Sequence, residues 1–131
     1  SKIALGHHRD DILETFFMNL FNGARIEAMP AKYLTDDGKH IVIRPLAFCK
    51  EKDIEIFAEG KQFPIIPCTL CGSQENMMRK KVKQMIKDWD AEFPGRSSSI
   101  FNSLKRVNPS HLLDAQLFNF LAIDEERSIK V

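Results

Sequence analysis

The feature that most constrains this chain is a pair of cysteines, Cys68 and Cys71, in the sequence Pro67-Cys68-Thr69-Leu70-Cys71-Gly72. A CxxC supplies two thiolates on one turn, close enough to bind a metal or to exchange sulfur. The only other cysteine, Cys49, is distant in sequence. Because a tetrahedral zinc site needs four ligands and a conventional iron–sulfur cluster uses four cysteines, this pair completes neither. The chain therefore either performs dithiol chemistry or uses ligands from residues that it does not contain.

Size and composition indicate one ordinary globular domain. The chain has 131 residues, of which 44% are hydrophobic and 28% charged, with a net charge of +1. No apolar run approaches the roughly 18 residues that cross a membrane, and Gly6 and His7 interrupt the first apolar stretch too early for a signal peptide. Three cysteines with one CxxC argue against a secreted disulfide scaffold. We therefore expect a cytoplasmic protein without a membrane partner.

The chain begins without methionine, and Ile3 already opens an apolar stretch. This pattern favours a piece of a longer protein over a short tag in front of a native N-terminus. Strands needed to complete a stable sheet are expected upstream, or from a second copy, because two strands alone do not suffice.

Strand and helix patterns alternate in the first half, and helix patterns dominate the second. The fold class is therefore α/β: the C-terminal part of a parallel sheet, followed by a helical region. We expect a division into an α/β part (1–66), a CxxC and basic helical part (67–113), and a weakly patterned C-terminal tail that is open to partial disorder (114–131). The predicted elements are a buried strand (2–7), a helix (10–21), an irregular stretch with a turn at 36–38 (24–38), a strand (40–44), and helices at 51–59, 73–93 and 97–107.

Charged side chains gather where the first strand ends and the first helix begins, in the sequence Gly6-His7-His8-Arg9-Asp10-Asp11-Ile12-Leu13-Glu14-Thr15. Ligands of open α/β sheets bind at this edge. Asp11 and Glu14 share a helix face and could hold Mg²⁺ through water, while His7 could bind a ligand or orient a carboxylate. A capped, solvated first turn with a structural histidine explains the spacing equally well.

Two further groups of side chains have a functional and a structural interpretation. Arg44 closes the second strand at the same edge, where a guanidinium suits a phosphate, although a surface ion pair is more common. Lys80, Lys83 and Lys87 share one helix face, which either is solvated or follows an RNA backbone. The CxxC itself is compatible with a redox dithiol, half a zinc site, part of an iron–sulfur cluster or a persulfide carrier, and Cys49 is expected to be a core or boundary thiol.

Taken together, three motifs resemble one family. They are Gly6-His7-x-x-Asp10-Asp11-x-x-Glu14-Thr15, Ile43-Arg44-Pro45-Leu46 and Pro67-Cys68-x-x-Cys71-Gly72-Ser73-Gln74. The combination resembles the PP-loop ATPases that thiolate tRNA, and among these the enzymes that make 2-thiocytidine. The first motif alone is shared with other PP-loop enzymes, whereas its combination with the third is much more specific.

The resemblance implies an adenine-nucleotide hydrolase-like fold and a transferase. In this family ATP and Mg²⁺ activate a cytidine in the tRNA anticodon loop, at position 32, by adenylation, and a sulfur species then displaces AMP. It also implies a [4Fe-4S] cluster on three cysteines, a sulfur donor that we expect to be a cysteine desulfurase, and a homodimer.

Residue by residue, the resemblance implies that Cys68 is a cluster ligand and that Cys71 and Asp11 are catalytic, Cys71 as a neighbour or sulfur relay. The residues expected at the ATP and Mg²⁺ edge are His7, Asp10, Asp11, Glu14 and Arg44.

Two parts of the family pattern are absent from these 131 residues: the SGGxDS phosphate-binding loop and the upstream CxxC. Side chains elsewhere do not replace a backbone nest around pyrophosphate, so we expect the chain alone to be inactive. Two alternatives stay open. One is a zinc-binding RNA or protein adaptor that uses the CxxC without catalysis, and the other is an interaction module with a metal-free CxxC.

Overall fold

The computed structural model describes residues 1–64 and 74–125. The CxxC, with Cys68 and Cys71, lies outside the described residues, as do Ser73 and the end of the tail. The chain divides into two compact units, residues 1–97 and 98–131. The division at 66 and 113 expected from the sequence stays a prediction.

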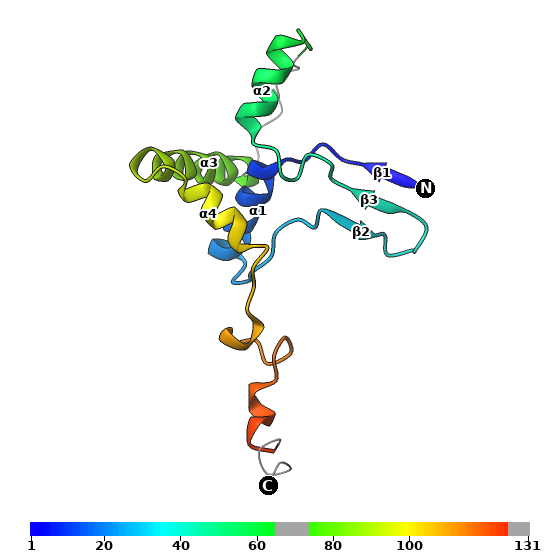
Figure 1. Cartoon of the computed structure of the whole chain (residues 1–131), viewed down its shortest axis with the longest axis vertical. Coiled ribbons are helices and arrows are strands. Elements are labelled where there is room, and N and C mark those ends of the chain that lie inside the picture. The colour runs from blue at the N-terminus through cyan, green and yellow to red at the C-terminus, as the bar shows by residue number, and fades with distance from the viewer. Residues whose placement is uncertain (65–73, 126–131) are drawn as a thin grey trace. The chain divides into compact units, whose positions relative to one another are not determined.

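Within the described residues, three short strands form one sheet in the order β1–β3–β2 (Figure 1). They are β1 (Lys2–Ala4), β2 (Lys32–Leu34) and β3 (Ile41–Ile43). β1 runs parallel to β3, with Ile3 opposite Val42, as the strand–helix–strand order predicted. β2 runs antiparallel to β3 and was missed, because a three-residue strand is too short to show a period-two pattern. The parallel pairing is thus confirmed within a mixed sheet.

The predicted turn at residues 36–38 is confirmed as the link between β2 and β3. The Thr35 amide donates to the carbonyl of His40 over 2.9 Å, which closes the hairpin. Gly38 has a φ of 72°, a left-handed conformation that glycine adopts without strain.

The expectation that the first strand is buried was wrong. All three side chains of β1 are exposed, whereas Val42 of β3 is 5% exposed. β1 forms an edge of the sheet in the described residues, so it has a paired neighbour on one side only.

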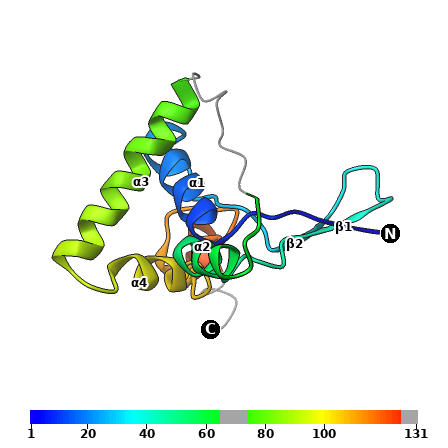
Figure 2. The same ribbon diagram turned by 90° about the horizontal axis from the view of Figure 1, so that it is seen from above.

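Helix α1 (Arg9–Asn22) confirms the predicted first helix and packs along α3 (Gln74–Glu92), as both views show (Figures 1 and 2). Its buried stripe includes Leu13, which is fully buried, and Phe17, whose ring meets Trp89 of α3 edge-on at 5.3 Å. Apolar burial along this helix pair is the main source of stability in the first unit.

The remaining elements are short. α2 (Glu51–Gly60) matches the predicted helix and buries no side chain. α4 (Arg96–Ser103) ends before the predicted residue 107, because the amides of residues 104–106 each bond three residues back, which tightens the chain into turns. Single 3-10 turns follow at Pro109–His111 and Phe120–Ala122. None of the helices in residues 1–64 and 74–125 combines the length and the apolar character that crossing a bilayer requires.

Candidate functional site

His7 and Arg44 meet just beyond the carboxyl ends of the parallel strands β1 and β3. The Arg44 Nε donates to His7 Nδ1 over 3.2 Å, and Arg44 Nη1 donates to the carbonyl of Pro30 over 2.6 Å. The guanidinium also lies 5.5 Å from the ring centre of Tyr33. These contacts use two of the five N–H donors of the arginine and fix its direction. The structure therefore brings together two residues that the sequence analysis placed at the carboxyl-end edge of the sheet. The pair is suited to an anionic ligand.

Asp11 takes part in a capping box at the start of α1. Its carboxylate accepts the backbone N–H of His8 over 3.0 Å, and its own N–H donates to His8 Nδ1 over 3.4 Å. Such reciprocal bonds satisfy two amides that a helix start leaves without partners. The sequence suggested a structural histidine as one alternative for this turn, and in the structure His8 fills that role.

Asp10 connects the start of α1 to the start of α2. Its Oδ1 accepts the backbone N–H of Glu51, the first residue of α2, over 3.0 Å, and lies 3.6 Å from Arg9 Nε. The residue before α2, Lys50, makes no side-chain cap of its own. Asp10 thus supplies a helix cap from a distant part of the chain.

Glu14 lies in a charged cluster between helices, which we name the Glu14–Lys83–Glu51 cluster. Its side chain is 2% exposed, and its carboxylate lies 3.4 Å from Arg79 Nη1 and 3.7 Å from Lys83 Nζ. Lys83 also donates to both carboxylate oxygens of Glu51, over 2.9 and 2.8 Å. One ammonium group therefore bridges carboxylates on α1 and α2.

Burial and neighbouring charges shift two pKa values in this cluster. Burial raises the pKa of the Glu14 carboxyl above 4.5; Lys83 and Arg79 oppose this rise, and Asp11 and Glu51 add to it. Burial alone would lower the pKa of Lys83, but the hydrogen bond to Glu51 and the charge of Glu14 outweigh it, so that pKa is raised. Lys83 is therefore cationic at neutral pH, and the ionised form of Glu14 depends on its cationic partners.

The three carboxylates of the first motif have different partners in the described structure. Asp11 bonds to the helix start, Asp10 to α2, and Glu14 to α3. No group of three or more histidine, cysteine, aspartate or glutamate side chains in residues 1–64 and 74–125 could hold a metal ion. Because Mg²⁺ is usually held by one or two carboxylates together with water molecules, the water-mediated site expected at Asp11 and Glu14 stays a prediction.

Replacing Lys83 by methionine should lower the free energy of unfolding by roughly 1–2 kcal/mol at pH 7, less than for a fully buried pair because a third of the side chain is exposed. The loss should shrink toward pH 4. Because the pKa of Glu14 is raised in the folded protein, protonation of Glu14 stabilises the folded state. This contribution to the free energy of unfolding is complete below about pH 4.5 and is lost as the pH rises through the folded pKa. Urea unfolding at both pH values measures the effect.

The matched control is Lys80→Met on the same helix, where the side chain is exposed. It should change stability by less than about 0.5 kcal/mol. A loss for Lys83→Met that is equal at pH 4 and pH 7 would show that Glu14 does not depend on this ammonium.

The remaining candidate residues lie apart from this edge. Cys49 is a free, exposed thiol two residues before α2, so the boundary interpretation holds for it and the core interpretation was wrong. The three lysines predicted to share one helix face do not act together. Lys83 contacts Glu14 in the Glu14–Lys83–Glu51 cluster, whereas Lys80 and Lys87 are exposed. Cys68 and Cys71 lie outside the described residues.

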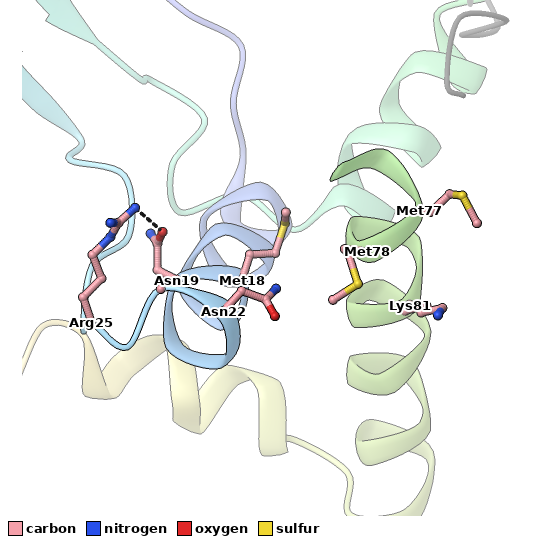
Figure 3. Close-up of a pocket in the computed structure, with 8 residues that line it drawn as sticks. Met18, Asn19, Asn22, Arg25, Met77, Met78 and Lys81 are labelled. Atoms are coloured by element: carbon pink, nitrogen blue, oxygen red, sulfur yellow. Dashed lines mark hydrogen bonds between the residues drawn. The ribbon is translucent and has the colours of Figure 1, made fainter. Parts of the chain in front are cut away.

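A groove lies at the other end of α1, opposite the N-terminal half of α3 (Figure 3). Met78 points from α3 toward α1, and Arg25 donates to Asn19 Oδ1 over 3.0 Å. A 14-residue helix spans about 20 Å, so the groove is well separated from the His7–Arg44 edge. Its lining residues are Met18, Asn19, Asn22, Gly23, Arg25, Met77, Met78 and Lys81.

Comparison with known proteins finds relatives that share one name. No family model matches the chain. The chain is 62% identical over 123 residues to a tRNA-cytidine(32) 2-sulfurtransferase of Haemophilus ducreyi. The aligned region makes up 94% of the chain and 39% of that protein. Proteins of the same name from Janthinobacterium sp. (64% over 120 residues, 92% of the chain and 38% of the protein) and Aeromonas salmonicida (59% over 129 residues, 98% and 43%) are also similar. The chain thus spans about two fifths of the length of these relatives.

The mixed α/β structure, with its small three-stranded sheet, is consistent with a part of a PP-loop ATPase family protein. Within that class, the resemblance read from the motifs is confirmed: over nearly all of its own length the chain is homologous to proteins named tRNA-cytidine(32) 2-sulfurtransferase. By name these relatives are transferases that act on tRNA.

Proposed function

We propose that this chain functions as part of a longer enzyme that transfers sulfur to C2 of a tRNA cytidine in an ATP-dependent reaction. The observation that supports this most strongly is identity of 56–64% over 92–98% of the chain with sulfurtransferases of that name. The His7–Arg44 pair adds a feature of the right chemistry, because it offers an oriented guanidinium at the edge where nucleotides bind to open α/β sheets.

In the proposed reaction, the cytidine C2 oxygen attacks the α-phosphorus of ATP, and pyrophosphate leaves. An incoming sulfide then attacks C2, and AMP leaves with the former C2 oxygen, so each thiolation consumes one ATP. Arg44 would hold a phosphate oxygen by charge-assisted hydrogen bonds, because its Nε contact with His7 and its Nη1 contact with Pro30 fix the guanidinium plane. His7 would orient Arg44 by accepting on Nδ1, which leaves its other ring nitrogen to carry the proton.

The cofactors and partners of the proposal come from the family resemblance. A [4Fe-4S] cluster with Cys68 as one ligand would bind the incoming sulfur, and Cys71 would lie beside it or relay sulfur. Mg²⁺ would enter with the ATP phosphates and be held through water at the edge formed by Asp10, Asp11 and Glu14, as the resemblance implies. The catalytic role of Asp11 would have to be compatible with its capping contact to His8. Partners would be tRNA, a cysteine desulfurase as sulfur donor, a thiol reductant that releases the persulfide sulfur of the desulfurase as sulfide and is itself oxidised to a disulfide, and a second copy of the enzyme, in the cytoplasm.

Arg44→Gln in the full-length protein should raise the KM for ATP by about tenfold, corresponding to the loss of a charge-assisted bond. Steady-state assays would follow 2-thiocytidine and AMP in the presence of tRNA, ATP and a sulfide source. In the wild-type reaction the two products should appear in equal amounts, as adenylation requires.

Arg25→Gln is the matched control, because Arg25 is exposed and lies beyond the far end of α1, and it should leave the KM for ATP unchanged. Formation of ADP in place of AMP would contradict the adenylated intermediate. An Arg44→Gln enzyme with an unchanged KM would remove Arg44 from the nucleotide pocket.

A further inference from the structure

The start of α2 is held by a ring of contacts that runs through three helices. Asp10 of α1 accepts the backbone N–H of Glu51, the Glu51 carboxylate accepts two contacts from Lys83 of α3, and Lys83 lies 3.7 Å from Glu14 of α1. The ring thereby returns to the helix from which it began. The ring joins distant parts of the sequence: Glu14 and Glu51 are 37 positions apart, and Glu51 and Lys83 are 32 positions apart.

α2 depends on this ring for its placement. The helix buries none of its side chains, and Phe57, in its C-terminal half, is 58% exposed. A helix without an apolar face packed on its neighbours has little to fix its direction beyond the contacts at its end. Here those contacts are the Asp10 cap and the Lys83–Glu51 pair.

The chain after α2 stays attached to the helix for a few residues. The Phe63 amide donates to the carbonyl of Ala58 over 3.0 Å, and the rings of Phe57 and Phe63 meet at 6.0 Å. The sequence that follows carries Cys68 and Cys71 and then continues into α3 at Gln74. The two helices linked by the Lys83–Glu51 pair are therefore the two that flank the CxxC in the chain.

We propose that Lys83 is a positioning residue, which fixes α2 relative to α1 and α3 by bridging Glu51 and Glu14 and thereby sets the separation of the two ends of the CxxC segment. The functional part of this inference rests on the proposed sulfur transfer. The carboxylates of Glu14 and Glu51 both lie within 4 Å of the Lys83 ammonium. Without that ammonium they would repel each other, and this repulsion would add to the loss of the bridge. The raised pKa of Lys83 agrees with this coupling, because Glu51 and Glu14 both raise it, whereas the pKa of Glu14 is raised by burial against the opposing charge of Lys83.

The direct test is hydrogen–deuterium exchange of the full-length protein, read at the amides of α2. Lys83→Met should speed exchange in α2 by about tenfold or more beyond any change at the buried amides of α1 and α3, which report the loss of global stability. Glu51→Gln should do the same to a smaller extent; it keeps the backbone N–H that Asp10 accepts, so it serves as a second variant if Lys83→Met folds poorly. Lys52→Met, an exposed lysine beside Glu51, is the matched control and should change nothing.

Thiolation kinetics separate positioning from general stability. Lys83→Met should lower kcat by about tenfold with an unchanged KM for ATP, and Lys83→Arg, which can still bridge two carboxylates, should restore kcat to within about threefold of the wild type. Wild-type exchange in α2 of both Lys83→Met and Glu51→Gln would overturn the positioning role, as would wild-type kcat in Lys83→Met. Absence of thiolation by the wild-type protein would instead reject the proposed function, and the exchange result would still decide whether Lys83 positions α2.

Discussion

Replacing Cys68 by serine in the full-length protein should reduce formation of 2-thiocytidine by at least about 100-fold. The proposed cluster is held by three cysteines, so the change removes a metal ligand rather than a group that supports one, and even supporting groups influence metal sites by 10–100-fold. The loss should appear in kcat, together with a lower content of iron and sulfide. Mass spectrometry of digested tRNA and metal analysis of the purified protein measure the two effects.

Cys49→Ser provides the control, since Cys49 is an exposed thiol at the boundary of α2 and has no role in the proposed chemistry. It should retain wild-type thiolation and wild-type iron. Unchanged thiolation in Cys68→Ser would remove Cys68 from the mechanism. One zinc per two chains, in place of iron and sulfide, would favour the adaptor hypothesis.

The 131-residue chain by itself should bind ATP with a Kd weaker than about 1 mM, whereas the full-length protein should bind it at micromolar concentration, a difference of about 4 kcal/mol or more. The chain supplies the His7–Arg44 pair but lacks an SGGxDS sequence, whose backbone amides would cradle the phosphates. Two oriented side chains do not replace several converging N–H donors. Isothermal titration calorimetry of both proteins under the same conditions gives the comparison.

The full-length protein is the positive control in this experiment, because it shows that the ATP and the buffer support binding. Micromolar affinity of the chain alone would contradict the proposal that the phosphate site is completed by residues outside it. It would also require a further phosphate-binding group within the 131 residues.

Much of the fold could be predicted because the relevant signals are local. Helix α1 has an apolar stripe over more than three turns, and the turn at 36–38 has the residues that a hairpin turn needs. The meeting of His7 and Arg44 also followed from the sequence, because parallel strands end at one edge and each residue follows a strand. These predictions depend on neighbours in the chain or on a general rule of sheet topology.

The partners of the acidic residues could not be predicted, because they depend on packing between distant segments. Glu14 meets Arg79 across 65 positions of sequence, and Glu51 meets Lys83 across 32. Spacing alone placed Asp11 and Glu14 on one helix face and suggested a shared cation. The packing of α3 against α1 supplies a cationic partner to Glu14, and the capping box uses Asp11, neither of which the spacing indicated.

The most direct test of the central proposal is the content of 2-thiocytidine at position 32 of tRNA, measured by mass spectrometry in cells from which the gene encoding this chain is deleted. The proposal predicts that the modified nucleoside disappears and returns when the intact gene is restored. Wild-type levels of 2-thiocytidine in the deleted strain would contradict it.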